Sequence, residues 1–222
     1  MAGRWLEEGS ARPAAVAATA ALAAGGALVA LATAAGVSPE VLLRDPAQQF
    51  GFVVYAGFVS ISGIFLVIGA AAVTLLAATL VPQHRALLLA ATALSVVIAY
   101  DDQFVFHDRI AGVHLGFPGS ILMAAYGLAA LALLLHPAVR RGPSGPGGLI
   151  LSGELLGLSA ALDLAVPYSV PVLVLEDLLK LTGYAAWFGF WLVFARSAIV
   201  QDAGGIAYVS DARATGSAVP SE

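Results

Sequence analysis

Residues 86–109 read ALLLAATALSVVIAYDDQFVFHDR, an apolar run of helical length that ends in three carboxylates, a histidine and an arginine. Asp101, Asp102 and Asp108 thus follow a segment apolar enough for the interior of a bilayer. An isolated charge in hydrocarbon costs about 2.5–3.5 kcal/mol on insertion scales, so such residues usually pair, line a cavity or bind an ion. The stretch predicts a membrane helix that carries a polar site at one end.

The composition of the whole chain is that of a multi-pass integral membrane protein. Of its 222 residues, 60% are hydrophobic and 11% charged, and the mean hydropathy is +0.92. Soluble domains carry about 25% charged residues. The 10 basic residues are scattered and the net charge is -4, so nucleic acid is excluded as a partner. The lack of cysteine excludes disulfides, thiolate zinc sites and cysteine-ligated iron–sulfur clusters.

We expect an all-α fold, a bundle of six transmembrane helices. The bundle forms one domain over residues 1–200, and residues 201–222 form a polar, disordered tail. The first apolar segment exceeds the roughly 7–15 residues of a signal-peptide core, so we interpret it as a retained span. The expected spans cover residues 13–36, 50–81, 86–106, 120–136, 149–166 and 172–200.

The placement of lysine and arginine predicts the orientation, because short loops rich in these residues stay on the cytoplasmic side. Six spans with an inside N-terminus predict a protein of the cell (cytoplasmic) membrane with both termini in the cytoplasm. The inside would then carry Arg4, Arg12, Arg85, Arg140, Arg141, Arg196 and Arg213, and the outside Arg44 and Arg109.

This topology places ionisable residues of three spans at a similar depth, near the outer leaflet. They are Asp101 and Asp102 on the third span, Asp163 on the fifth, and Glu176, Asp177 and Lys180 on the sixth. Glu176 and Lys180 form an i,i+4 pair. On a 3.6-residue helix, His107 points away from Asp101, and the two acids of the fifth span, Glu154 and Asp163, lie on nearly opposite faces.

Two motifs carry a resemblance to known sequences. They are Asp-Asp-x-Phe-x-x-His-Asp at residues 101–108 and Glu-Asp-x-x-Lys-x-x-Gly-x-x-x-Trp at residues 176–187. Both resemble motifs of a group of small, uncharacterised multi-pass membrane proteins of bacteria and archaea. The resemblance implies a polytopic membrane protein and supplies no activity.

The first functional hypothesis is a site for a metal or small ligand. Carboxylate and imidazole ligands suit zinc, manganese or iron, and a bound metal can activate water for hydrolysis of a lipid. The chain lacks the Glu-x-x-His pattern of di-iron bundles, however. The candidate ligands are Asp101, Asp102, His107, Asp108, Asp163, Glu176 and Asp177.

Two alternatives stay open. In a proton- or ion-coupled transporter or channel, Glu154 and Asp163 would mark a proton path, although their opposite faces argue against one pore lined by both. In an accessory or structural membrane subunit, Lys180 would clamp Glu176 and an aspartate of the third span. The partners expected are the lipid bilayer and a second copy or a membrane partner subunit.

Overall fold

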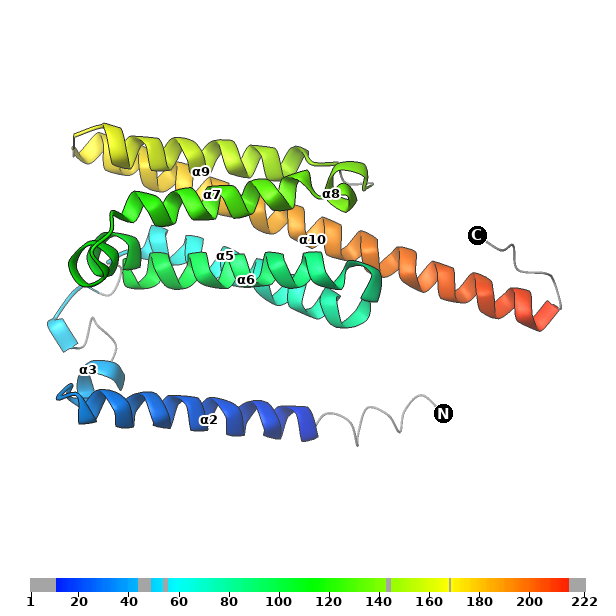
Figure 1. Cartoon of the computed structure of the whole chain (residues 1–222), viewed down its shortest axis with the longest axis horizontal. Helices are drawn as coiled ribbons and strands as arrows, with labels where there is room; N and C mark the ends of the chain where they lie inside the picture. The colour runs from blue at the N-terminus through cyan, green and yellow to red at the C-terminus, as the bar shows by residue number, and fades with distance from the viewer. Residues whose placement is uncertain (1–10, 44–48, 54–55, 143–144, 168, 216–222) are drawn as a thin grey trace. The chain divides into compact units, whose positions relative to one another are not determined.

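The computed structural model describes residues 11–43, 49–53, 56–142, 145–167 and 169–215, and no strand occurs among them. The chain divides into two compact units, Met1–Ala56 and Gly57–Glu222. The first unit contains helices α2 (Ala11–Ala34) and α3 (Pro39–Leu43). Figure 1 shows both helices.

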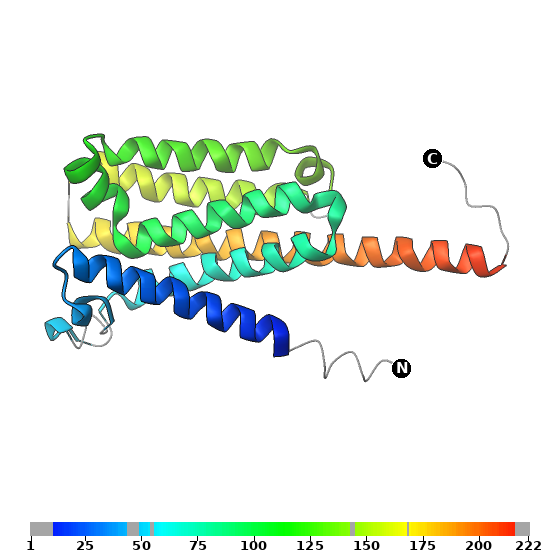
Figure 2. The same cartoon turned by 60° about the horizontal axis from the view of Figure 1, so that its bottom comes forward.

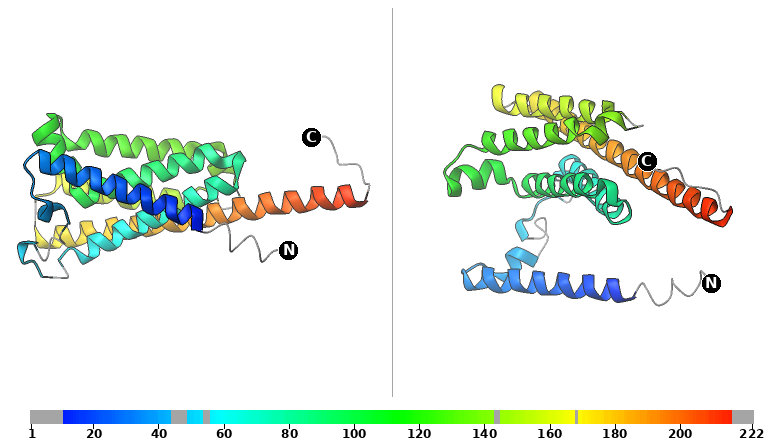
Figure 3. Two further views of the ribbon diagram at one scale, coloured as in Figure 1. Left: turned by 90° about the horizontal axis from the view of Figure 1, so that it is seen from below. Right: turned by 45° about the vertical axis from the view of Figure 1, so that its right-hand side comes forward.

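The second unit is a helical bundle. Its elements are α5 (Phe58–Leu80), the 3-10 turn η1 (Pro82–His84), α6 (Arg85–Phe104), the π-helical segment η2 (Phe106–Leu115), α7 (Gly119–Leu135), α8 (Pro137–Arg141), α9 (Gly147–Ala165) and α10 (Val170–Thr215). Figures 1 and 2 show α5 and α9 running alongside the first half of α10, with α6 and α7 beside those two helices. The second half of α10 continues past the other helices of the bundle (Figure 3).

Four described helices are long and apolar enough to cross a membrane, namely Phe58–Leu80, Pro82–Phe104, Gly147–Ala165 and Val170–Asp202. Two further apolar helices, Ala18–Ala34 and Gly119–Leu135, are shorter. The all-helical fold expected from the sequence therefore agrees with the structure. Of the six expected spans, four have a described helix of spanning length.

The helix ends differ from the expected spans where backbone conformation interrupts an apolar run. The span expected from residue 50 begins as α5 only at Phe58, because Gly57 has the left-handed φ of 70°. At the other end of the chain, helix continues beyond residue 200 to Thr215, into the segment expected to be disordered. Extending an existing helix adds one hydrogen bond for each residue fixed, so a polar sequence can prolong it.

The core of the bundle lies where α5 and α6 meet α10. Trp187, Trp191 and Phe194 of α10 are buried there against small residues such as Ala70 and Ala91. The rings of Trp191 and Phe194 meet edge to face, with centroids 5.7 Å apart. Small residues on the facing helices let large aromatic rings fill the space between them.

Helices α7 and α9 contribute much less to this core. The buried residues of α7 comprise Leu133 alone among its described side chains, and those of α9 are Leu149, Ser152 and Ser159. Two of these three are serines that bond to the backbone of α10: Ser152 Oγ donates to the Gly183 carbonyl at 2.8 Å and Ser159 Oγ to that of Glu176 at 3.2 Å. Helix α9 is therefore fixed against α10, whereas the side facing α7 is left open.

Candidate functional site

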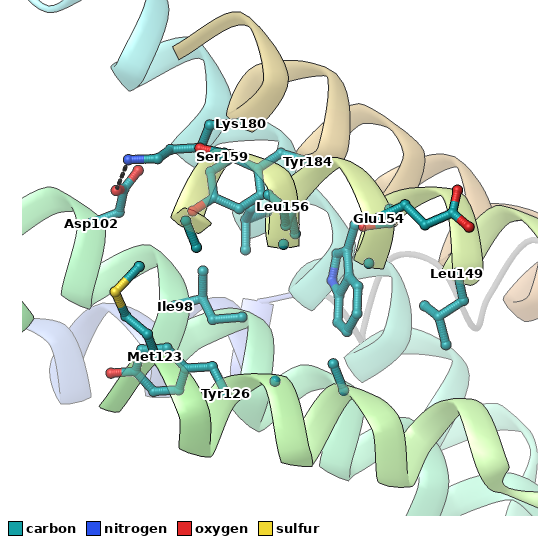
Figure 4. Close-up of a pocket in the computed structure, with 18 of the residues that line it drawn as sticks. Ile98, Asp102, Met123, Tyr126, Leu149, Glu154, Leu156, Ser159, Lys180 and Tyr184 are labelled. Carbon is teal, nitrogen blue, oxygen red and sulfur yellow. Dashed lines mark hydrogen bonds and ion pairs between the residues drawn. The ribbon is translucent and has the colours of Figure 1, made fainter. Parts of the chain in front are cut away.

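A cavity of about 500 Å³ occupies the space bounded by α6, α7, α9 and α10. Figure 4 shows it with Asp102 and Lys180 at one end, and with Leu149 and Glu154 at the other. The middle is walled mainly by apolar and aromatic side chains, including Ile98 and Tyr126. The ionisable residues that line the cavity are Asp101, Asp102, His107, Glu154, Asp163, Glu176 and Lys180.

Asp101 and His107 form a close pair at the end of α6. The backbone N–H of His107 donates to Asp101 Oδ1 at 2.8 Å, and its Nδ1 lies 2.7 Å from Oδ2. The helical wheel placed His107 away from Asp101, and that expectation is wrong. The reason is that α6 ends at Phe104 and Val105 takes the left-handed φ of 51°, which turns the chain back over its own last turn.

Lys180 of α10 joins two helices through ion pairs. Its Nζ donates to Asp102 Oδ1 of α6 at 3.4 Å and lies 3.6 Å from Glu176 Oε1, one turn earlier on α10. The side chains of Asp102 and Glu176 are 11% and 14% exposed. Asp102 Oδ2 is buried and has no hydrogen-bond partner among the described groups. This cluster, the Lys180 clamp, therefore links α6 to α10 and has one acceptor still open among the described groups.

The remaining predicted site residues divide between the cavity and its surroundings. Asp163 and Glu154 both line the cavity with exposed side chains, and neither forms an ion pair with a described residue. The cavity therefore reaches both acids of α9, although the wheel put them on opposite faces. Asp177 lies on the other side of Lys180, in a small hollow beside Gly63. The side chain of Asp108 lies outside the described residues.

The predicted ligand set does not converge on one point in the part of the chain that the structure describes. No three of the described His, Asp and Glu side chains are grouped closely enough to hold a metal ion. Asp101 is instead bonded to His107, and Asp102 shares Lys180 with Glu176. These side chains therefore form two charge-paired clusters at one end of the cavity.

Sequence reasoning missed the contribution of α7 to the site. Met123, Tyr126 and Gly127 line the cavity opposite the acidic residues. Tyr126 is the one aromatic residue in the helix GSILMAAYGLAALALLL, and that isolated ring was the available signal. Tyr184 and Trp187 of α10 also line the cavity.

A buried hydrogen bond fixes the indole of Trp187 at the cavity wall. Its Nε1–H donates to Ser95 Oγ at 2.9 Å, and Ser95 Oγ in turn donates to the Ala91 carbonyl. We expect Ser95→Ala to lower the free energy of unfolding by about 1–3 kcal/mol, because the buried indole N–H loses its acceptor. Thermal unfolding of the purified protein measures this. Ser62→Ala is the control, since the half-buried Ser62 donates, among the described groups, only to the Phe58 carbonyl of its own helix. Equal losses in both variants would contradict the prediction.

Comparison with known proteins places the chain in a family. No curated protein and no solved structure matches it. The family described as "Domain of unknown function (DUF8692)" matches residues 14–194. This match covers most of the chain and includes every residue that lines the cavity, from Val67 to Trp187. The chain therefore belongs to the family described as Domain of unknown function (DUF8692).

Proposed function

We propose that this protein is an integral protein of the cell membrane that binds a small amphipathic ligand inside its helical bundle. The observation that carries the proposal is the cavity of about 500 Å³, with most of its charged residues at one end, Glu154 at the other and apolar walls between them (Figure 4). Its volume falls within the roughly 300–1,000 Å³ of small-molecule sites, which are mostly apolar with a few placed polar groups. A polar head would lie near Asp102 and Lys180, and an apolar chain would extend towards Leu149.

The proposed membrane topology keeps the six spans expected from the sequence. The four long apolar helices support insertion, and the shorter helices Ala18–Ala34 and Gly119–Leu135 would complete the count. Both termini would be cytoplasmic, as the distribution of arginine predicts. The end of α6 and the beginning of α10 would then lie near the outer leaflet, so the head of the ligand would lie closer to the outer surface than its chain.

Small residues give the cavity its width. Gly127 of α7 and Gly153 and Gly157 of α9 line it, and a Cβ added at any of the three would meet no atom within 4 Å. Unfilled space between apolar walls forfeits van der Waals contacts on both sides, which an acyl chain would restore. The proposed ligand would therefore make the van der Waals contacts that α7 and α9 do not make with each other.

Binding is better supported than hydrolysis. The hydrolytic hypothesis used a metal to activate water, whereas Asp101 is paired with His107, and Asp102 and Glu176 are paired with Lys180. No three of the described His, Asp and Glu side chains are gathered as metal ligands. Paired charges at the end of an apolar cavity suit recognition of a polar head. The clamp of Lys180 then serves as the polar wall of the site as well as a link between α6 and α10.

Filling the cavity tests the proposal. We expect Gly157→Leu to abolish binding of a single-chain amphiphile, because the leucine side chain would project into the space of the acyl chain. The full chain in lipid nanodiscs would be titrated with an amphiphile whose chain is brominated, and quenching of tryptophan fluorescence would report its approach to Trp187. Gly189→Leu is the matched control, since Gly189 has equal free space but does not line the cavity. Unchanged quenching in Gly157→Leu would reject the proposed site.

A second candidate function is proton- or ion-coupled transport. It is favoured by one observation, that Asp163 near the end of α9 and Glu154 nine residues earlier line the same cavity. Carboxylates spaced along a membrane cavity can relay protons. Reconstituted vesicles should then show a flux driven by pH or voltage that Asp163→Asn removes. A flux of the same size in the variant would reject this candidate.

A further inference from the structure

We infer that the head group of the ligand is cationic, an alkyl ammonium rather than an anionic or neutral head. This inference rests on the proposed binding function and specifies its ligand. Its basis is the charge balance of the polar end of the cavity, the unpaired acceptors found there, and the aromatic rings around them.

Carboxylates outnumber cationic groups at this end. Among the side chains that the structure describes, the acidic residues here are Asp101, Asp102, Asp163 and Glu176, and the basic residues are Lys180 and His107. Lys180 is shared between two carboxylates, at 3.4 and 3.6 Å. Even with a protonated His107, the end keeps a negative excess. A sulfate or phosphate head would therefore meet more repulsion than attraction, whereas an ammonium would reduce the excess.

Two carboxylates retain acceptors for such a head. Asp163 lines the cavity without an ion pair or hydrogen bond to a described residue. Asp102 Oδ2 is buried and has no donor among the described groups, while Oδ1 of the same carboxylate is bonded to Lys180. An unsatisfied buried acceptor destabilises the site, and a charge-assisted hydrogen bond from an ammonium would recover that cost. A cation in this position would also neutralise the negative charge that remains because one lysine is shared between two carboxylates.

Aromatic side chains provide the second feature of a cation site. Tyr126, Tyr184 and Trp187, from α7 and α10, line the same cavity, and Figure 4 shows the two tyrosines beside the end occupied by Asp102. The faces of such rings attract ammonium groups, and aromatic surroundings are a common feature of sites for quaternary ammonium ligands. Carboxylates together with aromatic rings distinguish this end from a site for a hydroxyl head, which needs neither.

The test compares three amphiphiles with the same brominated alkyl chain and a trimethylammonium, hydroxyl or sulfate head. Each is titrated into the full chain in nanodiscs of zwitterionic lipid, with tryptophan quenching as the readout. We expect the ammonium compound to bind most tightly and the sulfate most weakly. We expect Asp163→Asn to weaken ammonium binding roughly tenfold, because the variant loses one charge contact in a partly desolvated site. Binding of the hydroxyl compound should stay unchanged. The control Glu40→Gln removes an exposed acid outside the cavity and should change neither.

The outcomes separate this inference from the function beneath it. Equal binding of the ammonium and hydroxyl compounds, or tighter binding of the sulfate, would overturn the cationic head while leaving the cavity as a binding site. If Gly157→Leu still bound all three compounds as tightly as the parent does, the binding function itself would be overturned. Because Asp163 is exposed and forms no ion pair with a described residue, Asp163→Asn should keep the melting temperature of the parent. Reduced ammonium binding in this variant would then report the lost contact rather than unfolding.

Discussion

Lys180→Met should lower the free energy of unfolding by about 3 kcal/mol, because it leaves the carboxylates of Asp102 and Glu176 largely buried without their shared cation. The side chain of Lys180 is 26% exposed, which places the effect at the lower end of the range for broken buried pairs. Thermal unfolding of the purified protein in a mild detergent measures the loss as a lower melting temperature.

A matched substitution on the same helix separates the clamp from the general effect of removing a long cation. Arg196 of α10 is exposed and forms no ion pair with a described residue, so Arg196→Met should change the melting temperature little. Adding Asp102→Asn to Lys180→Met should recover part of the loss, because it neutralises one of the stranded carboxylates. Equal melting temperatures for Lys180→Met and Arg196→Met would show that the clamp contributes nothing to stability.

Gly183→Ala should cost about 1–3 kcal/mol, although alanine usually favours a helix. A Cβ at Gly183 would lie 2.7 Å from Leu156 Cγ and 3.3 Å from the backbone nitrogen of Leu156, so α9 itself would have to move. That movement would also stretch the hydrogen bond from Ser152 to the Gly183 carbonyl. Melting temperature is again the measurement.

A glycine-to-alanine substitution elsewhere on α10 should raise the stability of the protein instead of lowering it. A Cβ at Gly189 would meet no atom within 4 Å, so Gly189→Ala should stabilise the protein by about 0.5–1 kcal/mol through helix propensity alone. A stabilising Gly183→Ala would mean that α9 and α10 do not pack as closely as the structure shows.

Sequence reasoning succeeded where a pattern is local or where topology alone aligns residues. The i,i+4 spacing of Glu176 and Lys180 corresponds to the ion pair at 3.6 Å. The pairing of Lys180 with an aspartate of the third span was predicted from their similar depth in the expected membrane topology. Antiparallel helices of spanning length bring the end of one beside the start of the other. The structure identifies that aspartate as Asp102.

The pairing of Asp101 with His107 could not be predicted in the same way. A helical wheel assumes that the helix continues, and nothing at Val105 indicates that it stops. Left-handed φ is rare for a β-branched residue, and a glycine or asparagine would have been the usual signal. In the structure, Asp101 accepts the His107 backbone N–H across this turn. Helix α7 also approaches closely at Gly119, where a Cβ would clash with the His107 carbonyl oxygen.

The cavity was also beyond sequence reasoning. An apolar face with alanine and glycine, such as that of α7, is equally suited to lipid, to a tightly packed neighbour or to an open space. Only the positions of the neighbouring helices distinguish these cases. Gly153 and Gly157 were compatible with close helix packing, yet in the structure a Cβ at either would meet nothing within 4 Å.

The two charge clusters differ greatly in the length of chain that each closes. Asp101 and His107 are 6 residues apart, whereas Asp102 and Lys180 are 78 apart. Closing the longer loop costs more chain entropy, and contacts that are distant in sequence usually form later in folding. The turn after α6 is thus closed by a local contact, whereas Asp102 gains its cation only where α10, far along the chain, lies against α6.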